Sequence, residues 1–174
     1  LGENGKIIFD FSSLTAAMIL NQPVDLQLTG VITRNDEKIL LVLPKGDYPS
    51  YITAGLVYEG GKYYFRAKRN TTELYWKEGS AGGDGAKTAW TMDTVLYVDQ
   101  GKTIPAPRTA NDTVVINHDC NIFITAGMQS TALKIKVTHN ATVFFGRAGD
   151  DTNNKNIPSG STLTIDSGSH VEFG

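Results

Sequence analysis

Cysteine and histidine are rare in this chain: Cys120 is the only cysteine among 174 residues, and there are three histidines. A single cysteine excludes a disulfide within the chain and a zinc site built from several cysteines. We interpret Cys120 as a small residue at a corner.

Long apolar runs are missing too. The longest, 16–20 and 39–43, fall far short of the roughly 20 residues of a membrane-spanning helix, so no membrane insertion is expected.

The sequence also has no excess of positive charge. It contains 16 Lys and Arg against 18 Asp and Glu, which gives a formal net charge of −2 and a pI of about 5.9. A protein that binds the nucleic-acid backbone needs a basic face. The charge balance therefore argues against a nucleic-acid partner.

Common motifs of catalytic sites are missing as well. No Gly-x-Ser-x-Gly motif positions a nucleophile, and no glycine-rich phosphate loop follows a strand. Asp150 and Asp151 are adjacent, but they begin the polar run 150–156, which is typical of a solvated loop. A polysaccharide lyase or hydrolase would need a placed set of acidic and basic residues. We therefore predict that the protein is not an enzyme and has no catalytic, cofactor-binding or metal-binding residues.

What the sequence does contain is typical of a turn-rich all-β protein: 18 glycines, many Ser, Thr and Asn residues, and 40% hydrophobic residues. In residues 1–100, alternating apolar segments separated by turn residues predict an antiparallel, sandwich-like β meander. We expect two hairpins there, one pairing 24–33 with 38–43 and one pairing 52–58 with 63–68. Residues 12–20 could form one or two helical turns with a Ser cap before Pro23. Further strands are expected over 73–77 and 90–98.

One pattern occurs three times near the C-terminus: two alternating apolar residues, a five-residue corner, and two more apolar residues. The copies are 114–124, 135–145 and 163–173. A period of about 21 residues is in the range of solenoid repeats. The third copy is displaced by seven more residues, and the polar run 150–156 could supply them as a loop.

Two topologies fit this pattern. In a β-solenoid the two arms of a repeat lie in different sheets, and equivalent residues stack into columns. In a run of hairpins, Ile116 would face Ile122 and Val137 would face Val143 across a short loop. The apolar columns all step together from one repeat to the next, as stacking requires, and this favours the solenoid. We predict an antiparallel β domain at 1–100, a linker at 101–110 and a β-repeat domain at 111–174.

Two kinds of side chain are candidates for binding. His118 and His139 occupy equivalent corners and could hold a metal, but no carboxylate recurs beside them, and we interpret them as turn residues. Exposed aromatic rings can stack on sugars or anchor a protein partner, and the competing interpretation is that they belong to the core. The candidate partner or glycan contacts are Tyr48, Tyr51, Tyr75, Trp76 and Trp90.

The segment Ser161-Thr-Leu-Thr-Ile-Asp-Ser-Gly-Ser-His-Val-Glu-Phe-Gly174 resembles the rungs of parallel β-solenoids in phage fibres, tailspikes and bacterial surface adhesins. The resemblance covers residues 103–174. It implies a homotrimeric structural or attachment module of a virion, such as a fibre, spike or head decoration, with a capsid or tail protein as partner. Three unequally spaced units suit a knob or base better than a shaft.

The alternative is a bacterial cell-surface or secreted adhesin domain that binds carbohydrate, such as a host surface glycan, outside the cell. Because the chain begins with Leu1 rather than Met, we expect a fragment or a processed product.

Overall fold

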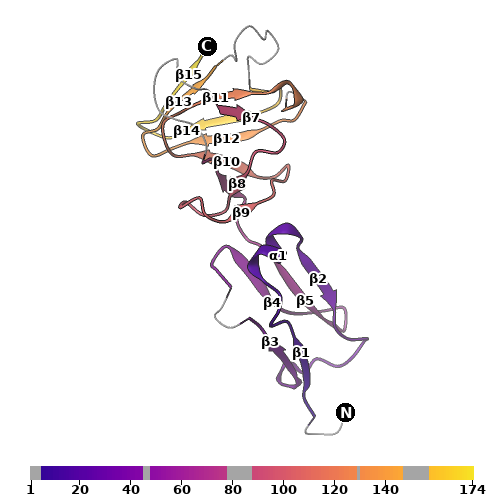
Figure 1. Cartoon of the computed structure of the whole chain (residues 1–174). Helices are drawn as coiled ribbons and strands as arrows, with labels where there is room; N and C mark the ends of the chain where they lie inside the picture. The colour runs from indigo at the N-terminus through magenta and orange to yellow at the C-terminus, as the bar shows by residue number, and fades with distance from the viewer. Residues whose placement is uncertain (1–4, 45–47, 78–87, 129, 147–156) are drawn as a thin grey trace. The chain divides into compact units, whose positions relative to one another are not determined.

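A computed structural model describes residues 5–44, 48–77, 88–128, 130–146 and 157–174. These residues are mostly strands, which confirms the all-β prediction (Figure 1). The chain forms two compact units, Leu1–Thr71 and Thr72–Gly174, which we call the N-terminal and C-terminal units. None of the helices in the described ranges has the length and apolar character needed to cross a bilayer.

The N-terminal unit contains a three-stranded antiparallel sheet in the order β2-β5-β4. Its strands are β2 (Val24–Gln27), β4 (Ile52–Glu59) and β5 (Lys62–Arg69). The hairpin predicted over 52–68 is confirmed: β4 pairs with β5 from Ile52↔Arg69 to Glu59↔Lys62. Two glycines with positive φ, Gly60 at 57° and Gly61 at 77°, form its turn.

The other predicted hairpin is wrong. Strand β2 pairs with β5, while β3 (Ile39–Val42) pairs in parallel with β1 (Ile7–Asp10). The segment between β2 and β3 explains this outcome, because it follows the β4–β5 hairpin instead of turning back. Leu28 N–H donates to Tyr63 O at 2.8 Å, and Ile32 N–H donates to Gly61 O at 2.8 Å. A 3-10 helix, η1 (Asp36–Lys38), then leads into β3.

The short helix expected before Pro23 is present as α1 (Ala16–Asn21), although its cap is Thr15 rather than a serine. The Thr15 hydroxyl accepts a hydrogen bond from Met18 N–H at 3.3 Å, which satisfies one of the helix's free N–H groups. Ile19 and Leu20 are buried. The core of this unit also contains Phe65, whose ring stacks on that of Phe11 with centroids 3.9 Å apart.

The C-terminal unit contains two sheets whose central strands are parallel (Figure 1). The six-stranded sheet has the order β14-β12-β10-β6-β8-β9, and the four-stranded sheet has the order β15-β13-β11-β7. The first comprises β6 (Glu73–Tyr75), β8 (Leu96–Tyr97), β9 (Pro105–Ala106), β10 (Thr113–Ile116), β12 (Lys134–Val137) and β14 (Thr162–Ile165). The second comprises β7 (Thr88–Trp90), β11 (Cys120–Ile124), β13 (Thr142–Phe145) and β15 (His170–Phe173). A 3-10 helix, η2 (Ala126–Met128), follows β11.

The apolar columns predicted for the first arm of each repeat are present. Val114, Ile135 and Leu163 lie in register, and so do Ile116, Val137 and Ile165. The column extends to Leu74, which pairs with Val114. Strands β10 and β11 belong to different sheets, so the hairpin alternative is wrong. Local spacing fits both topologies, and burial of the inward face against the second sheet decides between them.

In the second arm the predicted register of the first two repeats is wrong by two residues. Cys120, not Ile122, pairs with Val143, and Ile122 pairs with Phe145. The cause is the length of the corner: three residues separate Ile116 from Cys120, whereas five separate Val137 from Val143. The longer corner uses two residues with positive φ, His139 at 61° and Asn140 at 58°. Cys120 therefore lies in a strand and not in the corner.

The structure divides the chain at a different place from the linker expected at 101–110. Strands β6 to β9 all pair within the sheets of the C-terminal unit, and β9 lies inside the expected linker. The strand expected over 90–98 is two short strands, β7 and β8, separated by a turn in which Thr94 N–H donates to Thr91 O at 3.3 Å.

Gly168 is a position where the corner geometry requires glycine. Its φ is +85°, and an added Cβ would collide with the Asn140 side chain of the preceding corner. We expect Gly168→Ala to lower the free energy of unfolding of the C-terminal unit by about 1–3 kcal/mol, because strain and overlap add. Chemical denaturation measures this. Gly127→Ala in η2 of the same unit is the control, since no atom lies within 4 Å of its added Cβ; an equal loss there would contradict the prediction.

Candidate functional site

Three of the predicted contact aromatics are core residues of the C-terminal unit. Trp76 is 0% exposed, Trp90 is 1% exposed and Tyr75 is 9% exposed. The two indole rings pack against each other with centroids 5.1 Å apart. Trp76 N–H donates to Val115 O at 2.9 Å, which continues the pairing of β6 with β10. These rings present no face to a sugar and instead fill the interior between the two sheets.

The other two predicted contacts, Tyr48 and Tyr51, lie in the N-terminal unit and are half-buried. The Tyr48 hydroxyl donates to Leu14 O at 2.7 Å, and its partial burial raises the pKa of the phenol. Tyr51 O accepts from Asn70 N–H at 2.9 Å, beside the start of β4. The structure thus does not bring the five predicted residues together into one site.

A more exposed group of polar side chains lies on the outer face of the β2-β5-β4 sheet. Arg66 on β5 is at its centre: Nε lies 3.0 Å from Asp25 Oδ1 on β2, and Nη2 lies 2.8 Å from Glu59 Oε2 on β4. The guanidinium also lies over the Tyr64 ring, 5.0 Å from its centroid. We call Asp25, Glu59, Tyr64 and Arg66 the Arg66 face.

The geometry of the Arg66 face is set by strand register. Asp25 and Gly55 lie opposite Arg66 on the two neighbouring strands, and Gly55 has no side chain to cover the guanidinium. The hydrogen-bonded carboxylates raise the pKa of Arg66, led by Asp25. A hollow of about 350 Å³ adjoins this group, lined by Pro23, Val24, Asp25, Arg66, Ala67 and Lys68. An aromatic ring, a planar cation and two carboxylates beside a hollow can bind a polar, hydroxyl-rich ligand.

Sequence reasoning missed the Arg66 face because it paired β2 with the wrong strand. The opposite charges of Asp25 and Arg66 at outward positions of two strands were the available signal. This signal has meaning only once β2 is known to pair with β5, which the local pattern does not establish.

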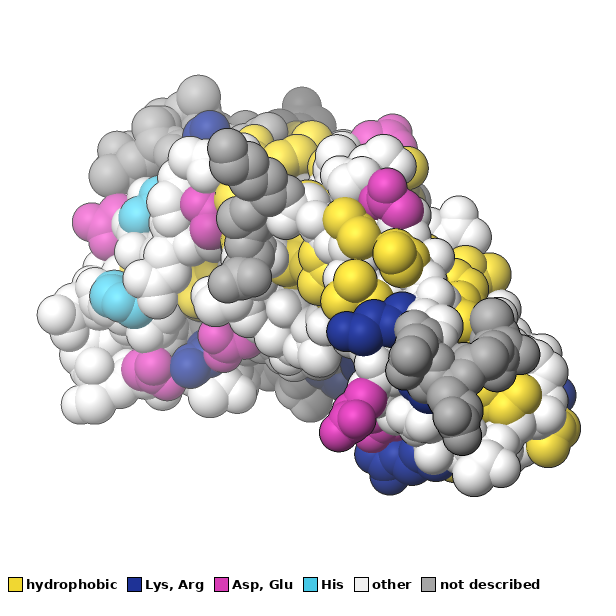
Figure 2. Space-filling view, turned by 90° about the horizontal axis from the view of Figure 1, so that it is seen from below, with side chains coloured by type: hydrophobic (Ala, Val, Ile, Leu, Met, Phe, Trp, Pro, Cys, Tyr) yellow, Lys and Arg dark blue, Asp and Glu magenta, His cyan; other side chains and the backbone are white. Residues whose placement is uncertain are grey.

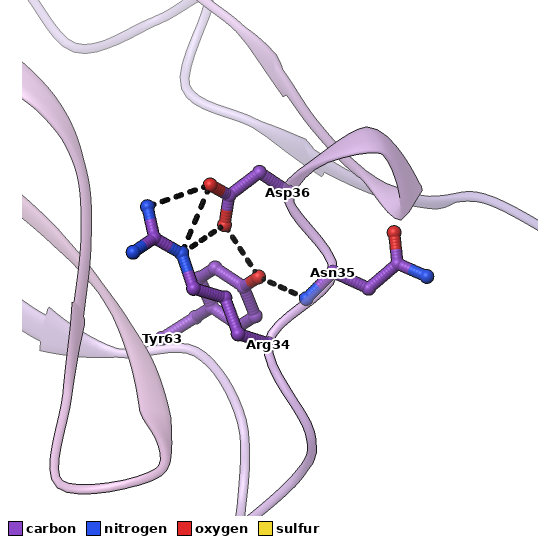
Figure 3. A network of polar contacts seen from close by, with 4 residues as sticks. All are labelled: Arg34, Asn35, Asp36 and Tyr63. Carbon is purple, nitrogen blue, oxygen red and sulfur yellow. Dashed lines mark hydrogen bonds and ion pairs between the residues drawn. The ribbon is translucent and has the colours of Figure 1, made fainter.

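A second polar network in the same unit holds the segment before β3 in place (Figure 3). The Arg34 guanidinium binds Asp36, with Nη2 2.8 Å from Oδ2. The buried Tyr63 hydroxyl donates to Asp36 Oδ1 at 2.7 Å and accepts from Asn35 N–H at 2.6 Å. Hydrogen bonds from Arg34 and Tyr63 hold the pKa of Asp36 below its ordinary value. This network is a structural tether that brings η1 onto β5.

The tether predicts a pH dependence. Because the pKa of Asp36 is lowered in the folded state, its contribution to stability is present above the unfolded pKa of about 3.9 and is lost as pH falls through the folded value. Asp36→Asn should therefore destabilise the N-terminal unit at neutral pH. The difference in stability between this variant and the wild type should shrink toward pH 3. Unfolding midpoints across this range, followed by tyrosine near-UV dichroism, measure the effect. A difference that grows on acidification would contradict the assignment.

His118, in the corner between β10 and β11, lies beside Lys102 from the turn between β8 and β9. Lys102 Nζ lies 2.9 Å from His118 Nδ1, and burial lowers the pKa of this lysine. His139, in the next corner, has its Nδ1 3.2 Å from the Thr138 hydroxyl. Within the described ranges, no group of three or more His, Cys, Asp or Glu side chains is placed to hold a metal ion. The sequence prediction of turn residues fits these contacts.

Cys120 is 1% exposed, and its burial raises the pKa of the thiol to about 12. The thiolate is the reactive form of cysteine, and at neutral pH this group is a protonated thiol. We expect the native protein to react slowly with an aromatic disulfide reagent at pH 7–8, and one thiol per chain to react at once in denaturant. Fast reaction of the native protein would show that Cys120 is accessible.

Exposed hydrophobic side chains occur in both units, and Figure 2 shows hydrophobic side chains among charged ones at the surface. In the C-terminal unit, Met92 and Val95 lie between β7 and β8, and two others lie on the last strands of the two sheets. Ile165 on β14 is 45% exposed and Phe173 on β15 is 55% exposed. Their neighbours in the same columns, Val137 and Phe145, are buried. We call β14 and β15 together the open edge.

Comparisons with models of protein families, with curated proteins and with solved structures found no match.

Proposed function

We propose that this chain is a non-enzymatic structural or attachment module of a phage particle, such as a fibre, spike or head decoration, and that it assembles as a homotrimer. We infer that the two sheets of the C-terminal unit form a short β-solenoid. The observation that carries the proposal is the parallel, in-register pairing of β10, β12 and β14 in one sheet and of β11, β13 and β15 in the other.

This arrangement suits a part that holds or presents other surfaces. Each rung bonds through its backbone to the next, and the interior between the sheets is filled by apolar columns and by the Trp76–Trp90 pair. Close-packed interiors resist deformation. The resemblance of residues 103–174 to virion appendages adds the homotrimer and the capsid or tail partner to the proposal.

Two measurements test the proposal. Sedimentation equilibrium should give three times the mass of the 18.9 kDa chain, and the trimer should resist detergent at room temperature. Proteomics of purified phage particles from the organism that encodes the chain should detect it as a particle component. A chain that is missing from particles but present in the cell-surface or secreted fraction would overturn the virion assignment.

The Arg66 face supports the alternative, a bacterial surface or secreted adhesin domain that binds carbohydrate. Sugar sites in proteins combine an aromatic ring with polar groups of fixed orientation, and Tyr64, Arg66, Asp25 and Glu59 supply both. A glycan array should then give hits that Arg66→Ala abolishes. Arg34→Ala is the matched control, because Arg34 also pairs with a carboxylate but lies outside this face. Glycan binding that survives Arg66→Ala would place the site elsewhere.

A further inference from the structure

The open edge has backbone groups ready to pair with another strand. Among the described strands, β14 pairs only with β12, and β15 pairs only with β13. The N–H groups of Thr162 and Asp166 donate to Leu133 O and Val137 O. On β15, the N–H groups of His170 and Gly174 donate to Ala141 O and Phe145 O. Because alternate residues of a strand point their N–H and C=O to opposite sides, those of Leu163, Ile165, Val171 and Phe173 point to the open edge.

The same four residues are the apolar ones. Ile165 and Phe173 are exposed, while Leu163 and Val171 are half-buried. The equivalent side chains on the neighbouring strands β12 and β13 are buried; for example, Ile135 is 1% exposed and Phe145 is 2% exposed. Within the part of the chain that the structure describes, the open edge therefore presents both unpaired backbone and apolar surface, a combination that natural sheets usually cover.

We propose that the open edge binds the open edge of a second copy of this chain, with β14 of each copy paired antiparallel to β15 of the other. A two-fold axis parallel to the strands and lying between the two edges generates this contact. The rotation places the six-stranded sheet of one copy, which ends at β14, next to the four-stranded sheet of the other copy, which ends at β15. Because β14 and β15 run in opposite directions from their shared corner, the new pairs are antiparallel.

The register follows from the corner at 166–170. Ile165 and Val171 flank this corner, so the rotation places Ile165 opposite Val171 of the second copy. Leu163 then lies opposite Phe173 of the second copy. These are the residues whose N–H and C=O groups point to the open edge, so each pair can exchange two hydrogen bonds. The pairs are also apolar against apolar, which continues the interior columns across the contact.

The outward-facing residues are compatible with the same register. Thr164 lies opposite Glu172 of the second copy, and Asp166 lies opposite His170 of the second copy. No like charges face each other. The other two-fold arrangement, about an axis perpendicular to the sheets, pairs β15 with itself over its full length and places Glu172 opposite Glu172. Like charges directly opposite each other destabilise a strand pair, so the charges favour the first arrangement.

This contact goes beyond the proposed homotrimer and does not depend on it, so the two can be separated by mass. Sedimentation that gives a dimer supports the open-edge contact and overturns the trimer. A trimer supports the proposed assembly and overturns the contact. Six copies support both, and a monomer at all accessible concentrations overturns both.

Cysteine cross-linking tests the register itself. We expect an oxidised mixture of Thr164→Cys and Glu172→Cys chains to form disulfide-linked heterodimers, because residues facing each other across such a pair have Cα atoms about 4.5 Å apart, within disulfide range. Neither variant alone should cross-link. The buried Cys120 contributes little background. Dimers from Glu172→Cys alone would show the perpendicular axis, and no cross-link in any sample would overturn the contact.

Charge substitutions at Thr164 give a second readout with a matched pair. This residue is exposed, so both variants should fold. In the Thr164→Glu variant, the new carboxylate would lie opposite Glu172 of the second copy, and the two-fold symmetry repeats this contact twice per dimer. Because like charges repel, association should weaken about three- to tenfold. Thr164→Lys would face the same carboxylates and should tighten it by a similar factor, less so in high salt. Equal dissociation constants for the two variants would overturn the register.

Discussion

Val143→Asp should lower the free energy of unfolding of the C-terminal unit by about 3–5 kcal/mol. Val143 is 0% exposed and lies in register between Cys120 and Val171, in a column with apolar neighbours on both sides. An aspartate there must either bury an unpaired charge or take up a proton, and both cost free energy. The loss is of the size that unfolds a marginally stable domain.

The two units can be followed separately in this experiment. Both tryptophans, Trp76 and Trp90, lie in the C-terminal unit, so the denaturation transition seen by tryptophan fluorescence reports on that unit. Thr162→Asp is the control, because Thr162 is an exposed strand residue of the same unit. It should cost less than about 1 kcal/mol. Similar losses for the two variants would mean that the side chain of Val143 does not face an apolar interior.

Trp90→Ala should have a comparable effect, lowering the free energy of unfolding by about 3–5 kcal/mol. Trp90 is 1% exposed, packs against Trp76 and pairs in register with Ile124 on β11. Removing the indole leaves a large cavity and also removes the ring contact. Far-UV circular dichroism in denaturant measures the change without depending on the indole that was removed.

Trp90→Phe is the matched control, since it keeps an aromatic ring and leaves a smaller cavity. It should lose clearly less stability than Trp90→Ala. If Trp90→Ala instead left stability unchanged and abolished binding of a ligand, Trp90 would be a surface contact residue, as the sequence hypothesis for the aromatic residues had it.

The β-repeat was predictable because its signal is local. Alternation of apolar and polar residues predicts which face of a strand is buried, and the two apolar positions of the first arm step together from repeat to repeat, which puts Val114, Ile135 and Leu163 in register. Both inferences need only the positions of apolar residues along the chain. The β4–β5 hairpin was predictable for the same reason, since its two strands are joined by a short glycine turn.

The length of a corner was harder to predict. Cys120 and Ile122 both alternate correctly as inward residues, so the sequence does not show which of them aligns with Val143. The answer depends on how many residues the chain needs to turn between the sheets, and His139 and Asn140 lengthen the second corner through positive φ.

The sequence by itself determined that this is an all-β chain with stacked repeats near its C-terminus, because strand periodicity and repeat spacing are both given by the positions of apolar residues along the chain. Only the tertiary structure decided which strands are partners: β2 with β5, β1 with β3, and β6 and β7 with the repeats. It also placed the tryptophans in the core and Arg66 at the surface. Which distant strands pair depends on how much apolar surface each possible pairing buries. That buried surface depends on the whole unit rather than on any one segment.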